Sequence, residues 1–203
     1  MNLEKLFEMQ RKLDERIEQE HPKQEGEDRL AKKILALQVE LGELCNCWRG
    51  FKYWSNNQEP RLKGYKEIKC KWCNGSGDDG SGVCPDCKCE GYVYKEYNPL
   101  LEEYVDGLHF FLSIGNDFSI DENTDFTPLN NHDVMTQIAI LYKRISDFWW
   151  KVHDNTDDHI ITYYFAFERY LGLSEALGFT WEQVEQAYTK KNAVNFERQE
   201  NGY

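Results

Sequence analysis

The segment from Gln38 to Trp54 most constrains how this chain can fold. It places Glu40 and Glu43 three residues apart among apolar residues with helical spacing, so both carboxylates lie on one face of a helix. Carboxylates with so many apolar neighbours should be partly buried, and a buried charge needs a partner. We therefore expect this helix to pack against another element that helps to supply the partner.

A second acidic pair with the same spacing, Glu103 and Asp106, lies on another strongly apolar segment, and few lysines or arginines flank either pair. Two such helices could cross and close a cage of four carboxylates. This cage would suit a hard divalent cation such as Mg²⁺, which prefers carboxylate oxygens to thiolates or imidazoles. The alternative is an ordinary solvated helix face, on which glutamates with this spacing are common.

Helical periodicity extends over most of the chain. Asp28, Asn98 and Thr180 are suitable N-caps, with a proline after Asn98 and a capping box from Thr180 to Gln183. We expect an all-α fold, a bundle of about five to six helices. The expected helices cover residues 3 to about 20, 28 to about 49 with Gly50 as the stop, 98–112, 134–152, 158–173 and 180–198.

The stretch from residue 56 to about 97 differs from the rest of the chain. It is rich in glycine, cysteine and charge and contains only short strand-like runs, which is typical of an inserted module. We therefore assign residues 1–203 to one helical domain that is interrupted by an insertion at residues 60–97.

Five of the seven cysteines lie in this insertion. Cys70 and Cys73 form one C-x-x-C pair, Cys84 and Cys87 form another, and a glycine-rich loop separates them, as in a four-thiolate zinc ribbon. Cys89 could replace Cys87, and free or redox-active thiols are the alternative to zinc. A Zn²⁺ ion with four cysteine ligands has no open position, so its role would be structural.

Charge and hydropathy exclude two classes of partner. The formal net charge of −12 argues against nucleic acid, because binding to phosphates needs a positive field. No apolar run reaches eighteen residues, and the N-terminal segment is a charged amphipathic helix, unlike a signal peptide. We expect a cytoplasmic protein that does not enter a membrane.

The last predicted helix carries basic and amide side chains on one face. Lys191, Asn195 and Arg198 follow one another at i, i+4 and i+7. A cation, an amide and a guanidinium in line could hold phosphate oxygens and a sugar or base edge. The alternative is a basic final turn that complements the helix dipole.

Three ordered stretches carry a family resemblance: ELGELCNCWRGFKYW, LLEEYVDGLHFFLSIG and the C-terminal tail that begins AYTKKN. They resemble the all-α dimeric dUTPases, which belong to a wider superfamily with the MazG-type nucleotide pyrophosphohydrolases. The similarity covers most of the chain outside residues 60–97.

The resemblance implies an α-helical homodimer that hydrolyses dUTP, and also dUDP, to dUMP with Mg²⁺. It implies that Glu40, Glu43, Glu103 and Asp106 are the metal ligands. Glu43 would be the general base for a water that it shares with a metal ion, and Glu40 the second catalytic carboxylate.

The resemblance also implies a set of substrate contacts. Lys191, Asn195 and Arg198 would contact the nucleotide, and Asn192 is a weaker candidate. Trp48 and Phe51 would help to wall the base and phosphate site, although either could equally belong to the core.

Two other functions remain open from the sequence. A MazG-like or dCTP-directed enzyme would carry the same acidic pairs, although the basic tail and the FKYW segment favour uracil. A non-enzymatic zinc-ribbon adaptor would use the helices only as a scaffold. Such an adaptor would depend on the cysteines more than on the carboxylates.

Overall fold

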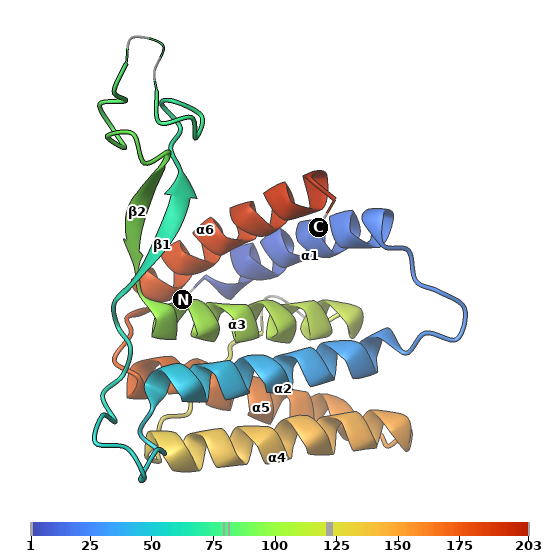
Figure 1. Cartoon of the computed structure of the whole chain (residues 1–203). Helices are drawn as coiled ribbons and strands as arrows, with labels where there is room; N and C mark the ends of the chain where they lie inside the picture. Colours follow the sequence, from blue (N-terminus) through green and yellow to red (C-terminus); the bar gives the residue numbers. More distant parts are fainter. Residues whose placement is uncertain (1, 79, 81, 121–123, 203) are drawn as a thin grey trace.

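The computed structural model describes residues 2–78, 80, 82–120 and 124–202 (Figure 1). Within these residues the chain forms six helices and one two-stranded sheet, so the prediction of an all-α bundle with a small insertion is confirmed. The elements are α1 (Leu3–Glu20), α2 (Arg29–Trp48), β1 (Gly64–Lys69), β2 (Tyr92–Tyr97), α3 (Pro99–Asp117), α4 (Val134–His153), α5 (His159–Ala176) and α6 (Trp181–Glu200).

The helices begin where the sequence offers capping side chains. Asp28 accepts a hydrogen bond from the backbone N–H of Ala31 at 2.9 Å, and Asn98 caps α3 in the same way, ahead of a proline. Thr180 and Gln183 form the predicted capping box of α6. These bonds satisfy amide groups that an α-helix leaves without partners at its N-terminus.

The C-terminus of α2 differs from the expectation. The helix ends at Trp48, and the residue with a left-handed backbone is Arg49, with φ 68°, rather than Gly50. Gly50 is required for another reason, because a Cβ atom there would lie 2.3 Å from the Trp48 ring. The absence of a side chain at Gly50 therefore leaves room for the Trp48 ring. The left-handed residue that follows the helix is Arg49 and not this glycine.

Helix α3 is the central element of the bundle. It lies between α1 and α6 on one side and α2 on the other, and it also contacts α5 (Figure 1). Tyr104 on α3 and Tyr170 on α5 stack with ring centroids 4.8 Å apart, and each hydroxyl donates to the other residue's backbone carbonyl. Because α3 is buried on several sides, the residues along its length meet side chains from four other helices.

Strands β1 and β2 pair antiparallel and form a ribbon that projects from the bundle beside α6 (Figure 1). The base of the ribbon is attached by backbone hydrogen bonds: Arg61 donates to Cys47 at the end of α2, and Leu100 at the start of α3 donates to Arg61. None of the described helices has the length and hydrophobicity that crossing a membrane requires.

Candidate functional site

The packing of α2 against α3 brings three of the predicted carboxylates together. Oxygens of Glu40, Glu43 and Glu103 lie within 4.8 Å of one another, with Glu43 exposed and the other two partly buried. Burial and the charges of Asp106 and Glu43 raise the pKa of Glu40 to about 7, and the same causes raise the pKa of Glu103 to about 7. A divalent cation would relieve this repulsion, and three carboxylates are a donor set that suits Mg²⁺.

Asp106, the fourth predicted ligand, has a different partner in the structure. Lys191 on α6 donates from Nζ to Asp106 Oδ2 at 2.6 Å and to Glu102 Oε1 at 3.0 Å. Few cations flank the acidic pairs in the sequence, and the fold supplies one from 85 residues further along. Burial tends to lower the pKa of Lys191, but the charges of Asp106 and Glu102 outweigh it and raise that pKa.

A groove of about 820 Å³ runs between α1, α2, α3 and α6. Its lining includes Glu40 from α2, Asp106 from α3, and Lys191, Asn195 and Arg198 from α6. The structure thus brings the predicted phosphate-binding residues into one groove with two of the four predicted metal ligands, Glu40 and Asp106. Such an arrangement of opposite charges can hold a polyanion together with a divalent cation.

The remaining predicted substrate contacts do not line this groove. Asn192 is buried at 5% exposure, on the same helix as the basic residues. Trp48 packs partly buried against the core, and Phe51 makes an edge-to-face contact with Trp54 at 5.7 Å. The alternative of a packing role for Trp48 therefore stays open, and the roles of these three residues stay predictions.

The floor of the groove contains a polar network that the sequence did not predict. Gln10 Oε1 accepts from the hydroxyl of Tyr188 at 2.7 Å and lies 2.7 Å from Nδ1 of His109. Gln10 and Ser113 both donate to Asp14 Oδ1, at 2.8 and 3.0 Å. The available sequence signal was Gln10 itself, a polar residue on the apolar stripe of α1 that Leu6 and Leu13 share.

Two buried acceptor atoms of this network have no partner among the described residues, namely Asp14 Oδ2 and His109 Nε2. Burial, assisted by the charge of Lys191, lowers the pKa of His109 to about 3, so its ring is neutral. With Nδ1–H directed at Gln10, Nε2 is an acceptor. Buried polar atoms without partners are costly, so we expect a water molecule or a polar ligand to pair with them.

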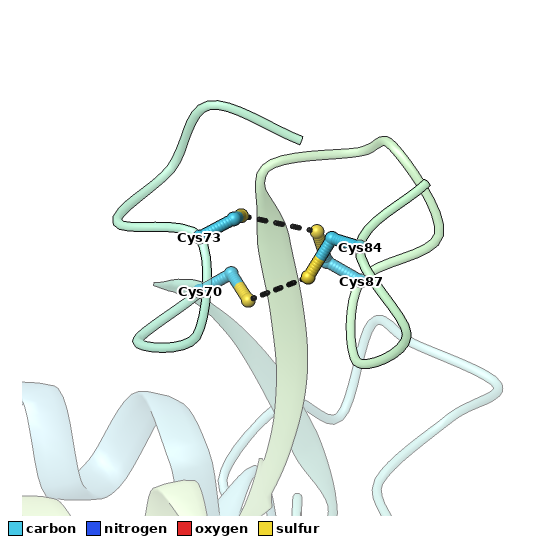
Figure 2. Close-up of side chains that lie close together, drawn as sticks. All are labelled: Cys70, Cys73, Cys84 and Cys87. Atoms are coloured by element: carbon cyan, nitrogen blue, oxygen red, sulfur yellow. Dashed lines mark hydrogen bonds between the residues drawn. The ribbon is translucent and has the colours of Figure 1, made fainter. Parts of the chain in front are cut away.

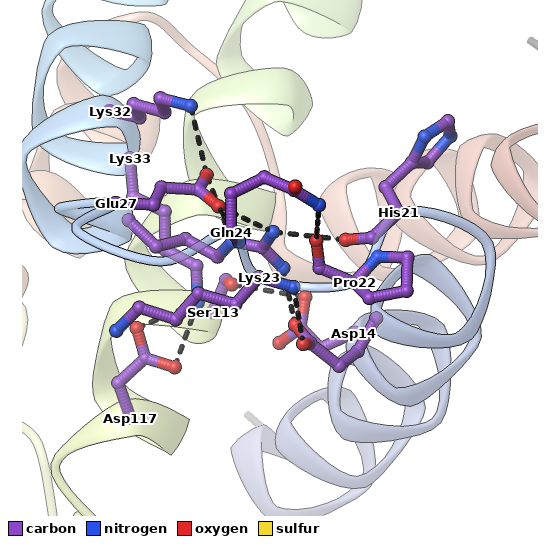
Figure 3. Close-up of polar contacts among 12 residues, drawn as sticks. Asp14, His21, Pro22, Lys23, Gln24, Glu27, Lys32, Lys33, Ser113 and Asp117 are labelled. Atoms are coloured by element: carbon purple, nitrogen blue, oxygen red, sulfur yellow. Dashed lines mark hydrogen bonds and ion pairs between the residues drawn. The ribbon is translucent and has the colours of Figure 1, made fainter.

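Ion pairs around the connector between α1 and α2 line another part of the groove (Figure 3). Lys33 on α2 pairs with Asp117 on α3 at 2.6 Å, and Lys32 pairs with Glu27 at 2.9 Å. Asp106 and Asp117 both line the groove from α3 and are eleven residues apart, so the groove follows this helix for about 16 Å.

A second cluster lies at the tip of the ribbon (Figure 2). The Sγ atoms of Cys70 and Cys84 are 3.7 Å apart, and those of Cys73 and Cys87 are 3.5 Å apart. These separations are too long for disulfides, but they fit a tetrahedron around Zn²⁺, whose edges are about 3.8 Å for bonds of about 2.3 Å. Cys89 is exposed and lies outside the cluster.

Backbone N–H groups near the cysteines donate hydrogen bonds to two of the sulfur atoms, which would stabilise thiolates bound to a metal. Gly77 N–H donates to Cys73 Sγ and Gly91 N–H donates to Cys87 Sγ, each at 3.2 Å. Both glycines have positive φ angles, and a Cβ atom on either would lie 2.5 Å from a carbonyl oxygen. The sequence around each C-x-x-C pair therefore places amide donors on the sulfur atoms, as metal ligands require.

Comparison with known proteins identifies the family of the chain. No curated protein matches the chain. A family model described as dUTPase matches residues 2–68 and 93–203, and the four clustered cysteines lie in the unmatched residues 69–92. The matched segments contain every residue that lines the groove and both acidic pairs. The chain therefore belongs to the all-α dUTPase family, whose activity is the hydrolysis of dUTP.

Proposed function

We propose that the groove is the active site of a Mg²⁺-dependent enzyme that hydrolyses dUTP and dUDP to dUMP. The observation that carries this proposal is the cluster of Glu40, Glu43 and Glu103 beside a groove that Glu40 lines together with Lys191 and Arg198. Carboxylates alone would repel a triphosphate, whereas carboxylates that hold a cation beside basic side chains would bind it.

Glu40, Glu43 and Glu103 would hold the Mg²⁺, and Asp106 would join them when Lys191 transfers its hydrogen bond to a phosphate oxygen. Bound Mg²⁺ would neutralise phosphate oxygens and make the attacking water more acidic. Lys191, Asn195 and Arg198 would orient the phosphates from α6. Asn192, Trp48 and Phe51 remain secondary candidates for substrate contacts.

Glu43 is the proposed general base because it is the exposed member of the cluster, so a water beside the cluster could contact it. It would accept the proton as the water oxygen bonds to phosphorus. The bond between the α- and β-phosphates then breaks, and pyrophosphate leaves from dUTP or phosphate from dUDP. Glu40, beside it on α2, would support the same step.

The polar floor of the groove favours uracil over cytosine. Asp14 Oδ2 and His109 Nε2 are unpartnered acceptors in the described part of the chain. Uracil offers an N–H donor at N3 and deoxyribose offers a hydroxyl, whereas cytosine has an acceptor at N3. Cytosine also has an amino donor at C4, so the discrimination requires one of these acceptors to face N3, where cytosine would bring two acceptors together in a buried place.

The same proposal includes a structural Zn²⁺ bound by Cys70, Cys73, Cys84 and Cys87, and a homodimer. The dimer is supported by exposed apolar side chains on three helices, among them Leu35, Val39, Met135, Trp150, Ile161 and Phe165. Reduced cysteines are consistent with a cytoplasmic location, which remains a prediction. Light scattering on the purified chain would test the dimer, and a monomer would contradict it.

A turnover screen tests the proposed reaction. The chain would be incubated with dUTP, dUDP, dCTP, dTTP and UTP, each with Mg²⁺ and with Mg²⁺ removed by a chelator. We expect release of dUMP from dUTP and dUDP only when Mg²⁺ is present. Equal rates on dCTP and dUTP would contradict the uracil assignment and favour a dCTP-directed or MazG-like enzyme.

A further inference from the structure

We propose that the ribbon acts as a positioning device for the active site, through Lys66 and Glu102. These two side chains would link the metal-bound tip of the ribbon to Lys191. The inference rests on the proposed function in one respect, because it takes Lys191 to be a contact of the nucleotide phosphates.

The link is a continuous chain of charged hydrogen bonds. Lys66 on β1 donates to both carboxylate oxygens of Glu102, which lies in the first turn of α3. Glu102 accepts from Lys191 at 3.0 Å, and Lys191 donates to Asp106 at 2.6 Å. The side chains of Glu102, Lys191 and Asp106 are 22%, 16% and 18% exposed, so three of the four members are shielded from solvent.

Lys66 is held in place by the ribbon itself. Its ammonium lies 4.3 Å from the centre of the Tyr97 ring on β2, and its backbone pairs with Lys95 across the ribbon. The position of Lys66 therefore depends on the register of the two strands. A slip of one residue would turn Lys66 to the other face of the ribbon, away from Glu102.

The register in turn depends on the four cysteines. A two-stranded ribbon alone is marginally stable in water, and the buried cluster at its tip contains only the cysteines, with Val93 packed against them. Cys70 follows β1 directly and donates its N–H to Gly91 at 2.9 Å, just before β2. A metal at these sulfurs would fix the strand ends about 13 Å from Lys66.

Loss of Lys66 should leave Glu102 with Lys191 as its only cation among the described residues. Lys191 would then be drawn toward Glu102 and away from the groove, while the carboxylate cluster would keep its place on α2 and α3. The expected consequence is weaker binding of the nucleotide phosphates with a smaller change in the chemical step. Lys66 and Glu102 are positioning residues in this scheme and touch no reacting atom.

The test compares Lys66→Met, Lys66→Arg and Lys95→Met in the full chain. Lys95 is the matched control, since it lies opposite Lys66 on β2 and its side chain forms no hydrogen bond or ion pair with the described residues. We expect KM for dUTP to rise about tenfold in Lys66→Met with a smaller change in kcat, to recover in Lys66→Arg and to stay unchanged in Lys95→Met. The dissociation constant of a non-hydrolysable dUTP analogue, measured by calorimetry, should follow KM.

The proposed dependence of the ribbon on metal bound by the four cysteines is tested with a zinc-selective chelator, in excess Mg²⁺ and with a thiol reductant. Chelation should weaken analogue binding in the wild type by a factor similar to that of Lys66→Met, and should cause no further loss in that variant. Equal additional losses in both proteins, or no loss in the wild type, would overturn the proposed link. If Lys66→Met does not fold, Glu102→Gln replaces it and should also weaken analogue binding.

The two proposals fail in different ways. A wild-type chain that binds the analogue but hydrolyses no dUTP would overturn the proposed function alone. A wild-type chain that hydrolyses dUTP with variants indistinguishable from it would overturn the positioning role alone.

Discussion

The carboxylate cluster and the cysteine cluster are both candidate metal sites, but they are held together in opposite ways. Glu40, Glu43 and Glu103 are fixed by two helices that share a hydrophobic core, so the cluster persists despite its internal repulsion. The four cysteines have almost no apolar packing around them beyond Val93. A site whose scaffold folds alone can exchange its metal and do chemistry, whereas a site without a core depends on its metal for structure.

The largest expected effect is the loss of Zn²⁺ binding when the cysteine cluster is changed. Cys84→Ser should abolish stoichiometric Zn²⁺ binding, because three thiolates lose the closed tetrahedral set. The helical far-UV circular dichroism should remain, since the bundle has its own core. Cys89→Ser, which changes an exposed cysteine outside the cluster, should keep one Zn²⁺ per chain. Unfolding of the bundle in Cys84→Ser would show that the two regions are not independent.

The next effect concerns catalysis at the carboxylate cluster. Glu43→Gln should lower kcat for dUTP by about 10³, because the amide cannot accept the proton of the attacking water. Its thermal unfolding temperature should match or exceed that of the wild type, since one repelling charge is removed. Glu59→Gln, at an exposed loop position, serves as the control. Wild-type turnover in Glu43→Gln would remove it from the mechanism.

A smaller effect is expected in the polar floor. Asp14→Ala should raise KM for dUTP about tenfold, because a buried acceptor for the nucleotide is lost. The value of kcat should change less, since Asp14 is remote from the carboxylate cluster along the groove. Glu25→Ala, an exposed carboxylate in the connector, should leave both constants unchanged. Wild-type KM in Asp14→Ala would exclude it from substrate binding.

The smallest effect is a dependence of stability on pH in the metal-free protein. The pKa of Glu40 and of Glu103 is raised to about 7 in the folded state, above the ordinary value of 4.5. Their protonation therefore favours the folded state below about pH 4.5, and this contribution is lost as the pH rises through about 7. Thermal unfolding of the metal-free chain should show a lower unfolding temperature at pH 8 than at pH 5.5.

Added Mg²⁺ sharpens this last test. The ion competes with protons for the same oxygens, so it should raise the unfolding temperature more at pH 8 than at pH 5.5. The double variant Glu40→Gln with Glu103→Gln should lose most of the difference between the two pH values. A variant that kept the full pH dependence would assign it to other groups.

Much of the fold was predictable because the information is local. Apolar spacing and the caps Asp28, Asn98 and Thr180 fix where helices run and begin, and the C-x-x-C pairs fix the insertion. Helix α2 ends at Trp48, next to the predicted end at about Arg49, but the role of Gly50 in making room for the Trp48 ring is a contact that spacing does not show.

The site was predictable only in part. Acidic pairs and the basic tail are visible as helix faces, but which faces meet depends on the packing of helices far apart in sequence. The bond from Lys191 to Asp106 and the contacts of Gln10 with His109 and Tyr188 each join residues 85 or more positions apart. No local sequence pattern predicts such pairs. The partner of Asp106 and the polar floor of the groove could therefore be identified only in the folded chain.

The reciprocal bonds between Tyr104 and Tyr170 have a consequence for motion around a bound nucleotide. Sliding α3 along α5 by one turn would break both hydrogen bonds and unstack the rings at once, inside a core that leaves no water to replace them. Helix α3 is therefore the stationary wall of the groove. Any closing movement must come from α1, α2 or α6, which take no part in the contact between Tyr104 and Tyr170.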